Sequence, residues 1–172
     1  MQFLQGEEID NLLRACEHSA YHLELQDSYS TPEEAEPFRK FLAGEPDDYA
    51  WCDDWDSLIH EVTSTGRVVR RARVVTEPHT DYVRWSMVVA HRNIAAGEDV
   101  RYLPRHLIDP AELTTDDFWL LDDRVLAFTV FEPSGRYAGW AITHDPVVVE
   151  HARAAWNQVW DEAVSHAEYV KA

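Results

Sequence analysis

Five residues in the middle of the sequence have side chains that could bind and activate an acidic substrate: Arg73, Glu77, Tyr82, Arg84 and Arg101. A guanidinium group pairs with two oxygens of a carboxylate or phosphate at once. The carboxylate of Glu77 could then accept a proton as a general base. If these side chains converge in one cleft, they form the pocket of a small enzyme of specialised metabolism. If the arginines pair with acids at the rim of a sheet, they only neutralise local charge.

The other reactive residue types point to no further catalytic centre. Glu77, His79 and Asp81 have the ligand types of a divalent-ion site, but turn formation and helix capping explain this segment equally well. We therefore predict no metal and no cofactor. Cys16 and Cys52 have no CxxC spacing, so we expect two free thiols in a reducing compartment. A GxSxG motif and a phosphate-binding glycine loop are both absent from the sequence.

Hydrophobic periodicity predicts the elements that position these residues. The predicted helices cover residues 7–18, 31–44, about 55–65, 79–95 and the C-terminal segment from 146 onward. Within the second of these, Pro37 predicts a kink or a new start. The predicted strands cover residues 20–27, 67–75, 99–103, 118–121, 124–131 and 136–143. The aromatic set Trp119, Trp140, Trp156 and Trp160 could line a ligand site, but core packing is the favoured interpretation.

The order of these elements predicts an α/β fold with a mixed sheet and helices packed on it. Residues 67–103 read as strand, helix and strand, which is a parallel βαβ unit. The apolar runs from 118 to 143 are separated by turn-forming residues, so an antiparallel meander should join the parallel strands. We expect residues 1–172 to form a single domain, with a helical, acidic portion over 1–66 and the βαβ unit, meander and last helix over 67–172.

The net charge limits the classes of partner. The chain has 15 basic and 32 acidic residues and a formal charge of −17. Phosphate backbones and anionic membrane surfaces both require a basic face, so we expect no direct contact with nucleic acid or membrane. The N-terminus fits neither a signal nor a transit peptide, and no segment has the ~18 apolar residues of a membrane span. The expected location is the cytoplasm.

The negative charge is concentrated near the N-terminus. Residues 24–56 carry eleven acids against Arg39 and Lys40. A solvated face is one interpretation. Because aromatic residues lie between these acids, the alternative is an interface for a basic protein, such as a DNA-binding regulator. The residues predicted for this partner surface are Asp47, Asp48, Tyr49, Trp51, Asp53, Asp54 and Trp55.

Four motifs resemble an uncharacterised family of small actinobacterial proteins. They are SAYHLE at Ser19–Glu24, EPHTDYVR at Glu77–Arg84, GEDVRYLP at Gly97–Pro104 and DFWLLDD at Asp117–Asp123. The resemblance extends from about residue 15 to 169. Members are often encoded near helix-turn-helix regulators in Streptomyces-type genomes, which implies a regulatory or accessory role. The resemblance implies no enzymatic activity.

The order of elements from the βαβ unit to the last helix is also similar to one half of the phospholipase D-like fold. That superfamily has a catalytic His, a Lys two positions later and an Asp five positions after the Lys. Aligned on Asp122, this sequence has Thr115 and Asp117 at the His and Lys positions. Phosphodiester cleavage needs the imidazole as nucleophile and the Lys to hold phosphate oxygens. The resemblance thus implies a degenerate centre, and by the same analogy a homodimer.

These observations lead to two hypotheses. The first is a non-catalytic regulatory or accessory protein that binds a protein partner, possibly a helix-turn-helix regulator, or a small anionic ligand. The second is an enzyme with the arginine-lined pocket described above and Glu77 as base. Convergence of the five side chains in one cleft would favour the enzyme.

Overall fold

The computed structural model describes residues 1–4, 8–133 and 135–171. Its elements are β1 Gln2–Leu4, α1 Glu8–Ala15, β2 Ser19–Glu24, α2 Pro32–Ala43, α3 Asp53–Thr63, β3 Val68–Val75, α4 Asp81–Ala96, β4 Glu98–Pro104, β5 Phe118–Leu121, β6 Val125–Phe131, β7 Tyr137–Thr143, α5 Pro146–Glu162, β8 Val164–Ser165 and α6 His166–Tyr169.

The strands form one eight-stranded mixed sheet in the order β1-β7-β6-β5-β2-β3-β4-β8. Strands β2, β3 and β4 are parallel to one another, whereas every other pairing is antiparallel. The predicted βαβ unit corresponds to β3, α4 and β4, and the predicted meander to β5, β6 and β7. The sequence did not predict that β2 would join the two, between β3 and β5.

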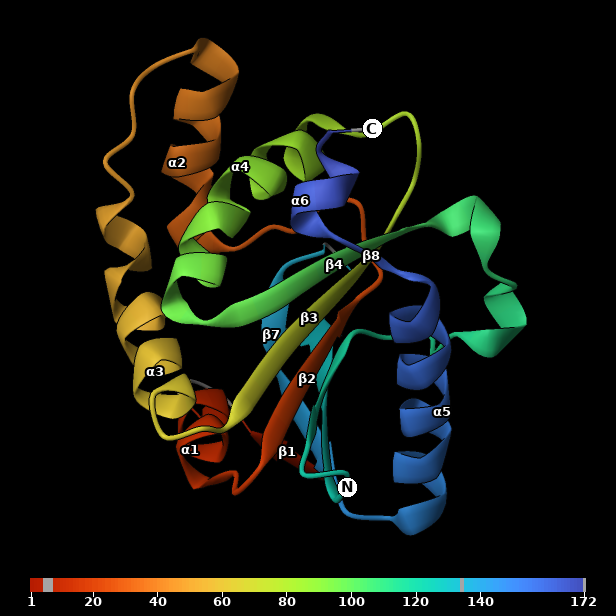
Figure 1. Ribbon diagram of the computed structural model, residues 1–172. Coiled ribbons are helices and arrows are strands. Elements are labelled where there is room, and N and C mark those ends of the chain that lie inside the picture. The colour runs from red at the N-terminus through yellow and green to blue at the C-terminus, as the bar shows by residue number, and fades with distance from the viewer. Residues whose placement is uncertain (5–7, 134, 172) are drawn as a thin grey trace.

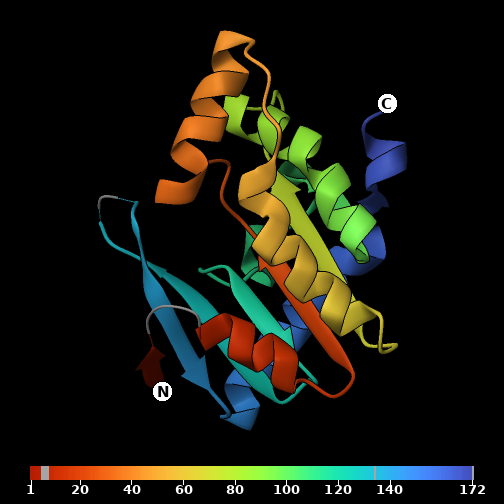
Figure 2. The ribbon, with the colours of Figure 1, turned by 90° about the vertical axis from the view of Figure 1, so that its left-hand side faces the viewer.

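Helices cover both faces of this sheet (Figures 1 and 2). Helices α1, α3 and α4 lie on one face, which we call the α4 face, and α5 lies on the other, the α5 face. On the α4 face, Leu13, Ile59 and Trp119 belong to one apolar core. On the α5 face, Leu23 and Trp156 belong to another. The central strand β2 is therefore buried on both sides.

Several local boundaries differ from the sequence predictions. Helix α2 runs through Pro37 without a second start, and Gly44 ends it in a left-handed conformation (φ 66°). The first helix ends at Ala15, so that the chain can turn into β2. The C-terminal helix ends at Glu162, and α6 starts after a capping box formed by Ser165 and Glu168.

Candidate functional site

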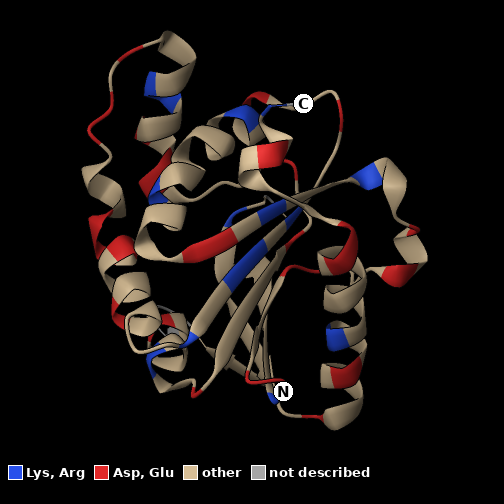
Figure 3. Cartoon of the chain, viewed as in Figure 1, with Lys and Arg blue, Asp and Glu red and all other residues tan. Residues whose placement is uncertain are grey.

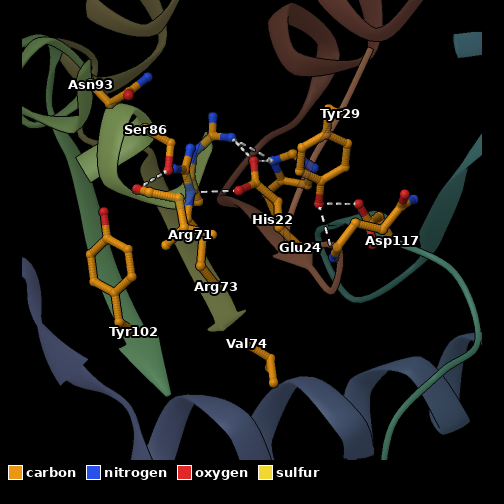
Figure 4. Close-up of polar contacts among 12 residues, drawn as sticks. His22, Glu24, Tyr29, Arg71, Arg73, Val74, Ser86, Asn93, Tyr102 and Asp117 are labelled. Atoms are coloured by element: carbon orange, nitrogen blue, oxygen red, sulfur yellow. Dashed lines mark hydrogen bonds and ion pairs between the residues drawn. The ribbon is translucent and has the colours of Figure 1, made fainter. Parts of the chain in front are cut away.

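A buried cluster of charged side chains lies across the three parallel strands on the α4 face (Figure 4). Arg71, in the middle of β3, is only 6% exposed. Its Nε donates to Glu98 of β4 at 2.8 Å, and its Nη1 donates to Glu24 of β2. Arg73, two residues further along β3, pairs with the second oxygen of Glu24. Each strand thus contributes a charge that a neighbouring strand neutralises.

Neutral donors complete the shell around Glu98. The indole Nε1 of Trp55 in α3 donates to Oε1 of Glu98 at 3.0 Å, and the side-chain amide of Asn93 in α4 donates to the same oxygen at 3.2 Å. Buried carboxylates are costly unless several donors satisfy them. Because these donors come from two helices and a strand, the cluster also ties α3 and α4 to the sheet.

The protonation states in this cluster follow from its burial and its arginines. Burial alone would raise the pKa of Glu24, but the charges of Arg73 and Arg71 outweigh it and lower the pKa to about 2. Burial, reinforced by Arg71, lowers the pKa of His22 to about 3. His22 is therefore neutral, and its Nδ1 accepts from Arg71, 2.9 Å away, because a guanidinium can only donate. The charges of the cluster are therefore paired at neutral pH, although the buried Nε of Arg73 has no hydrogen bond of good geometry.

The two positions that would carry the phosphodiesterase His and Lys hold side chains unsuited to that chemistry. Thr115 is exposed and donates to Asp116 at 2.9 Å. Asp117 is only 1% exposed and accepts hydrogen bonds from the Tyr29 hydroxyl at 2.5 Å and the Leu25 amide at 2.8 Å (Figure 4). Burial raises the pKa of Asp117 to about 6, although both hydrogen bonds oppose this.

Asp122, at the Asp position of the same pattern, has a different role. Its carboxylate accepts from the backbone amides of Glu17, His18 and Ser19 at 2.7 to 3.0 Å. Its own backbone is left-handed (φ 51°), in the turn from β5 to β6. Asp122 therefore joins this turn to the start of β2.

The structure does not bring the five predicted ligand-binding residues together. Arg73 and Tyr82 lie on the α4 face, where Arg73 pairs with Glu24 and the Tyr82 hydroxyl donates to Glu34 at 2.7 Å. Glu77 follows β3 and accepts from the Tyr169 hydroxyl at 2.7 Å. Arg84 is exposed and pairs with Asp81. Arg101 belongs to the α5 face, because alternate strand residues point to opposite sides.

This arrangement corrects two expectations about the arginines. Arg73 and Arg101 lie on opposite faces of the sheet, so they do not line one pocket together with Glu77. The geometry therefore gives the enzyme hypothesis no support. The acids that neutralise Arg71 and Arg73 lie in the sheet interior, not at its rim. They are Glu24 and Glu98, and both are buried.

The residues of the predicted partner surface are exposed or half-buried. Trp51 stacks on Trp85 with ring centroids 5.7 Å apart, and Trp55 donates to Glu98. The remaining contacts of this set are Asp47 with Trp51 and Lys40, Asp48 with the Ala50 amide, Tyr49 with His91, and Asp53 with Arg92. Asp48, Asp53 and Asp54 are exposed, whereas the three aromatic side chains are half-buried. The aromatic residues therefore also pack against the fold, and their role in binding a partner stays a prediction.

Sequence reasoning missed three members of the buried cluster, His22, Glu24 and Glu98. The first two alternate with Tyr21, Leu23 and Leu25, which is typical of a strand with one solvated face. A strand pattern alone does not show whether a helix covers the polar side. The signal available was the arginine-rich segment 67–75, which needs buried acids if it is a central strand.

A protein-family model described as "Domain of unknown function (DUF6879)" matches residues 7–171. The chain belongs to this family. A search of curated proteins gave no match for this DUF6879 chain.

Two solved structures resemble the DUF6879 chain in fold. NucT from Helicobacter pylori, a phospholipase D-like nuclease, has a TM-score of 0.55 and 10% identity over 95% of this chain and 96% of its own. TrmBL2, an archaeal chromatin protein with a novel mode of DNA binding, has a TM-score of 0.54 and 10% identity over 95% of this chain. The match spans only 52% of TrmBL2, about half its length. The predicted mixed α/β fold is confirmed, and the fold is similar to that of the phospholipase D-like protein NucT.

These neighbours correct the expectation of no direct contact with nucleic acid. That expectation rested on net charge, yet this fold occurs in a DNA-binding chromatin protein and in a nuclease. A total charge averages over the surface and says little about one local site. The exclusion of nucleic acid was therefore wrong.

No group of three or more His, Cys, Asp or Glu residues in the described part of the chain could hold a metal ion. None of the helices in the described part of the chain is long and apolar enough to cross a membrane.

Proposed function

We propose that this DUF6879 domain acts by binding and not by catalysis, as a regulatory or accessory module for a protein partner or a small anionic ligand. One observation carries the proposal: a buried carboxylate, Asp117, stands where a phosphodiesterase has its phosphate-holding Lys. Its oxygens are already engaged by Tyr29 and Leu25. A carboxylate in this position repels a phosphate group, and its hydrogen bonds hold it in place.

The surface next to this position supports the same conclusion. A hollow of about 490 Å³ lies beside Thr115. Its polar lining consists of Thr114, Thr115, Thr129, Asp116 and His151, and no Lys or Arg belongs to its described lining. A developing negative charge on a phosphoryl group needs cationic donors. Three hydroxyls, one acid and the single imidazole of His151 do not supply the permanent positive charge of a Lys or Arg.

The regulatory role comes from the resemblance to actinobacterial proteins encoded near helix-turn-helix regulators. The organism, the gene neighbourhood and the cytoplasmic location stay predictions.

Hydrolysis assays test the absence of catalysis. We expect the wild-type protein to leave bis(p-nitrophenyl) phosphate and labelled single-stranded DNA uncleaved, like a sample without protein. Thr115→Ala and Asp117→Asn, purified in the same way, should give the same baseline. Wild-type hydrolysis that disappears in both variants would overturn the proposal, whereas equal hydrolysis in all three samples would identify a contaminant. The double variant Thr115→His/Asp117→Lys tests whether cationic groups at these positions can restore cleavage.

A further inference from the structure

Arg70 differs from every other arginine in the described part of the chain. Each of the others has an ion pair or a hydrogen bond from its guanidinium group, whereas Arg70 contacts only the aromatic rings of Tyr21 and Trp160. Its guanidinium carbon lies 5.5 Å from the first ring centroid and 5.0 Å from the second. In a chain of charge −17, an unpaired guanidinium is unexpected, because carboxylates are abundant.

Arg101 lies beside Arg70 on the same α5 face. The parallel register places Arg70 opposite Asp99 of β4, so that Arg101 is two residues further along that strand. Its guanidinium carbon lies 4.1 Å from the ring centroid of Trp160. Its one ion pair is a long contact of 3.4 Å to Asp99, and its buried Nε has no hydrogen-bond partner. Both guanidinium groups therefore have unused donors next to the same indole.

The aromatic rings hold these arginines without using their hydrogen-bonding capacity. Trp160 is 8% exposed and stacks on Trp156, which in turn stacks on Tyr21. A guanidinium contacts a ring through its flat face, whereas its N–H donors point outward in its own plane. The rings thus provide a rigid platform, and the donor edges stay available for an anion.

Solvent can reach this platform. The Arg101 side chain is 32% exposed, and Arg70 is partly exposed. Val68, which precedes Arg70 on the same face, is 40% exposed. In Figure 3, basic bands cross β3 and β4, an acidic band crosses the beginning of β4, and acidic residues predominate on the surrounding helices and loops.

We propose that Arg70 and Arg101 form a binding site for a phosphate group on the α5 face. Two planar guanidinium groups on neighbouring strands, each with several N–H donors, suit an anion with three or more acceptor oxygens better than a carboxylate with two. The phosphate can belong to a small molecule or to a nucleic-acid strand, since both offer the same oxygens.

This site names a ligand for the proposed binding function, and it rests on that function only in assuming that the bound phosphate is not hydrolysed. Different results would contradict the two proposals. Phosphodiester cleavage would overturn the binding-only function and leave the phosphate site intact. Absence of saturable phosphate binding would overturn the site and leave the binding-only function intact.

Titration with inorganic phosphate at constant ionic strength tests the site. The Nε–Hε signals of Arg70 and Arg101 and the indole signal of Trp160 should shift together and saturate in two-dimensional NMR spectra. Arg70→Gln and Arg101→Gln should each weaken binding about tenfold or more, because each removes charge-assisted hydrogen bonds. Arg153→Gln is the matched control, since Arg153 is a partly exposed arginine that pairs with Glu150. It should bind like the wild type.

Several outcomes would overturn the phosphate site. These are shifts that do not saturate, equal loss of binding in the Arg153→Gln control, or an equal response to acetate. Arg101→Lys keeps the charge but removes the planar set of guanidinium donors. Undiminished phosphate binding by this variant would also contradict the proposed geometry. Unchanged backbone amide spectra would show that the variants are folded.

Two further ligands identify the source of the phosphate once the site is established. Tighter binding of a mononucleotide than of a short single-stranded oligonucleotide at these residues would assign the site to a small ligand. The reverse order would assign it to nucleic acid. Either order supports the site, and binding of neither ligand at these residues would contradict it.

Discussion

Strand β3 separates three arginines onto two faces of the sheet, and their environments differ. Arg71 and Arg73 point to the α4 face, where buried glutamates neutralise them. Arg70 points to the α5 face and only stacks on aromatic rings. The same residue type therefore has two roles on one strand. An arginine paired with buried acids on neighbouring strands favours one strand register, whereas an arginine held only by its flat face can still bind an anion.

The largest expected effect comes from removing the paired arginine. Arg71→Met leaves Glu98 as a buried carboxylate without its cation and leaves Glu24 with Arg73 alone, which should lower the free energy of unfolding by about 3–5 kcal/mol. Chemical denaturation at neutral pH measures this loss. Arg70→Met is the matched control on the other face and should cost no more than about 1 kcal/mol. Equal losses would remove the distinction between the faces.

If Arg71→Met does not fold, a compensated variant keeps the test open. Glu98→Gln/Arg71→Met removes the stranded carboxylate and keeps Glu24 as the partner of Arg73. This variant should recover part of the lost stability, because neutral amides are cheaper to bury than unpaired charges. No recovery would indicate that the cost lies in packing and not in charge.

A smaller effect with a distinct pH dependence is expected at Asp117, at the border of the buried cluster. Its folded-state pKa of about 6 exceeds the ordinary value of 3.8. The contribution of Asp117 to the free energy of unfolding is therefore most favourable below about pH 4, where the carboxyl is protonated, and it is lost as the pH rises through 6. Relative to wild type, Asp117→Asn should gain about 2–3 kcal/mol between pH 4 and pH 7, at about 1.4 kcal/mol for each pKa unit.

Urea unfolding at several pH values between 4 and 7 measures this difference. The exposed neighbour supplies the control, since Asp116→Asn should give a stability curve parallel to that of the wild type. A parallel curve for Asp117→Asn as well would contradict the raised pKa.

The smallest expected effect is on the α5 face. Arg101→Gln removes a cation–π contact with Trp160 and a long ion pair, which together stabilise the fold by about 0.5–1 kcal/mol. Thermal or urea unfolding in the absence of phosphate measures it. If Arg101→Gln lowers the free energy of unfolding as much as Arg71→Met does, then Arg101 stabilises the fold as Arg71 does. This result would count against a ligand-binding role for Arg101.

Local patterns predicted much of the fold, but contacts between distant segments were beyond them. The Val- and Arg-rich run at 67–75 and the turn residues near 122 and 134 predicted the βαβ unit and the meander, and the structure has both. The tryptophans favoured for the core, such as Trp119 and Trp156, are buried. Strand β8 and helix α6 were missed, although the capping box at Ser165 and Glu168 marks a new helix start.

The candidate site was harder to predict because its ion pairs join separate strands. Glu24 meets Arg73 only because β2 lies between β3 and β5, and this position is set by packing across the whole sheet. Arg70 and Arg101 looked equivalent to Arg73 in the sequence. Only the strand register shows which of them share a face.

Asp122 shows how one side chain can tie a turn to a distant segment of the chain. Its carboxylate accepts hydrogen bonds from the backbone amides of Glu17, His18 and Ser19, and its own amide donates to the Ser19 carbonyl. These bonds join the β5–β6 turn to the start of β2. The alignment of two paired strands, β2 and β5, therefore depends in part on a residue that lies outside both of them.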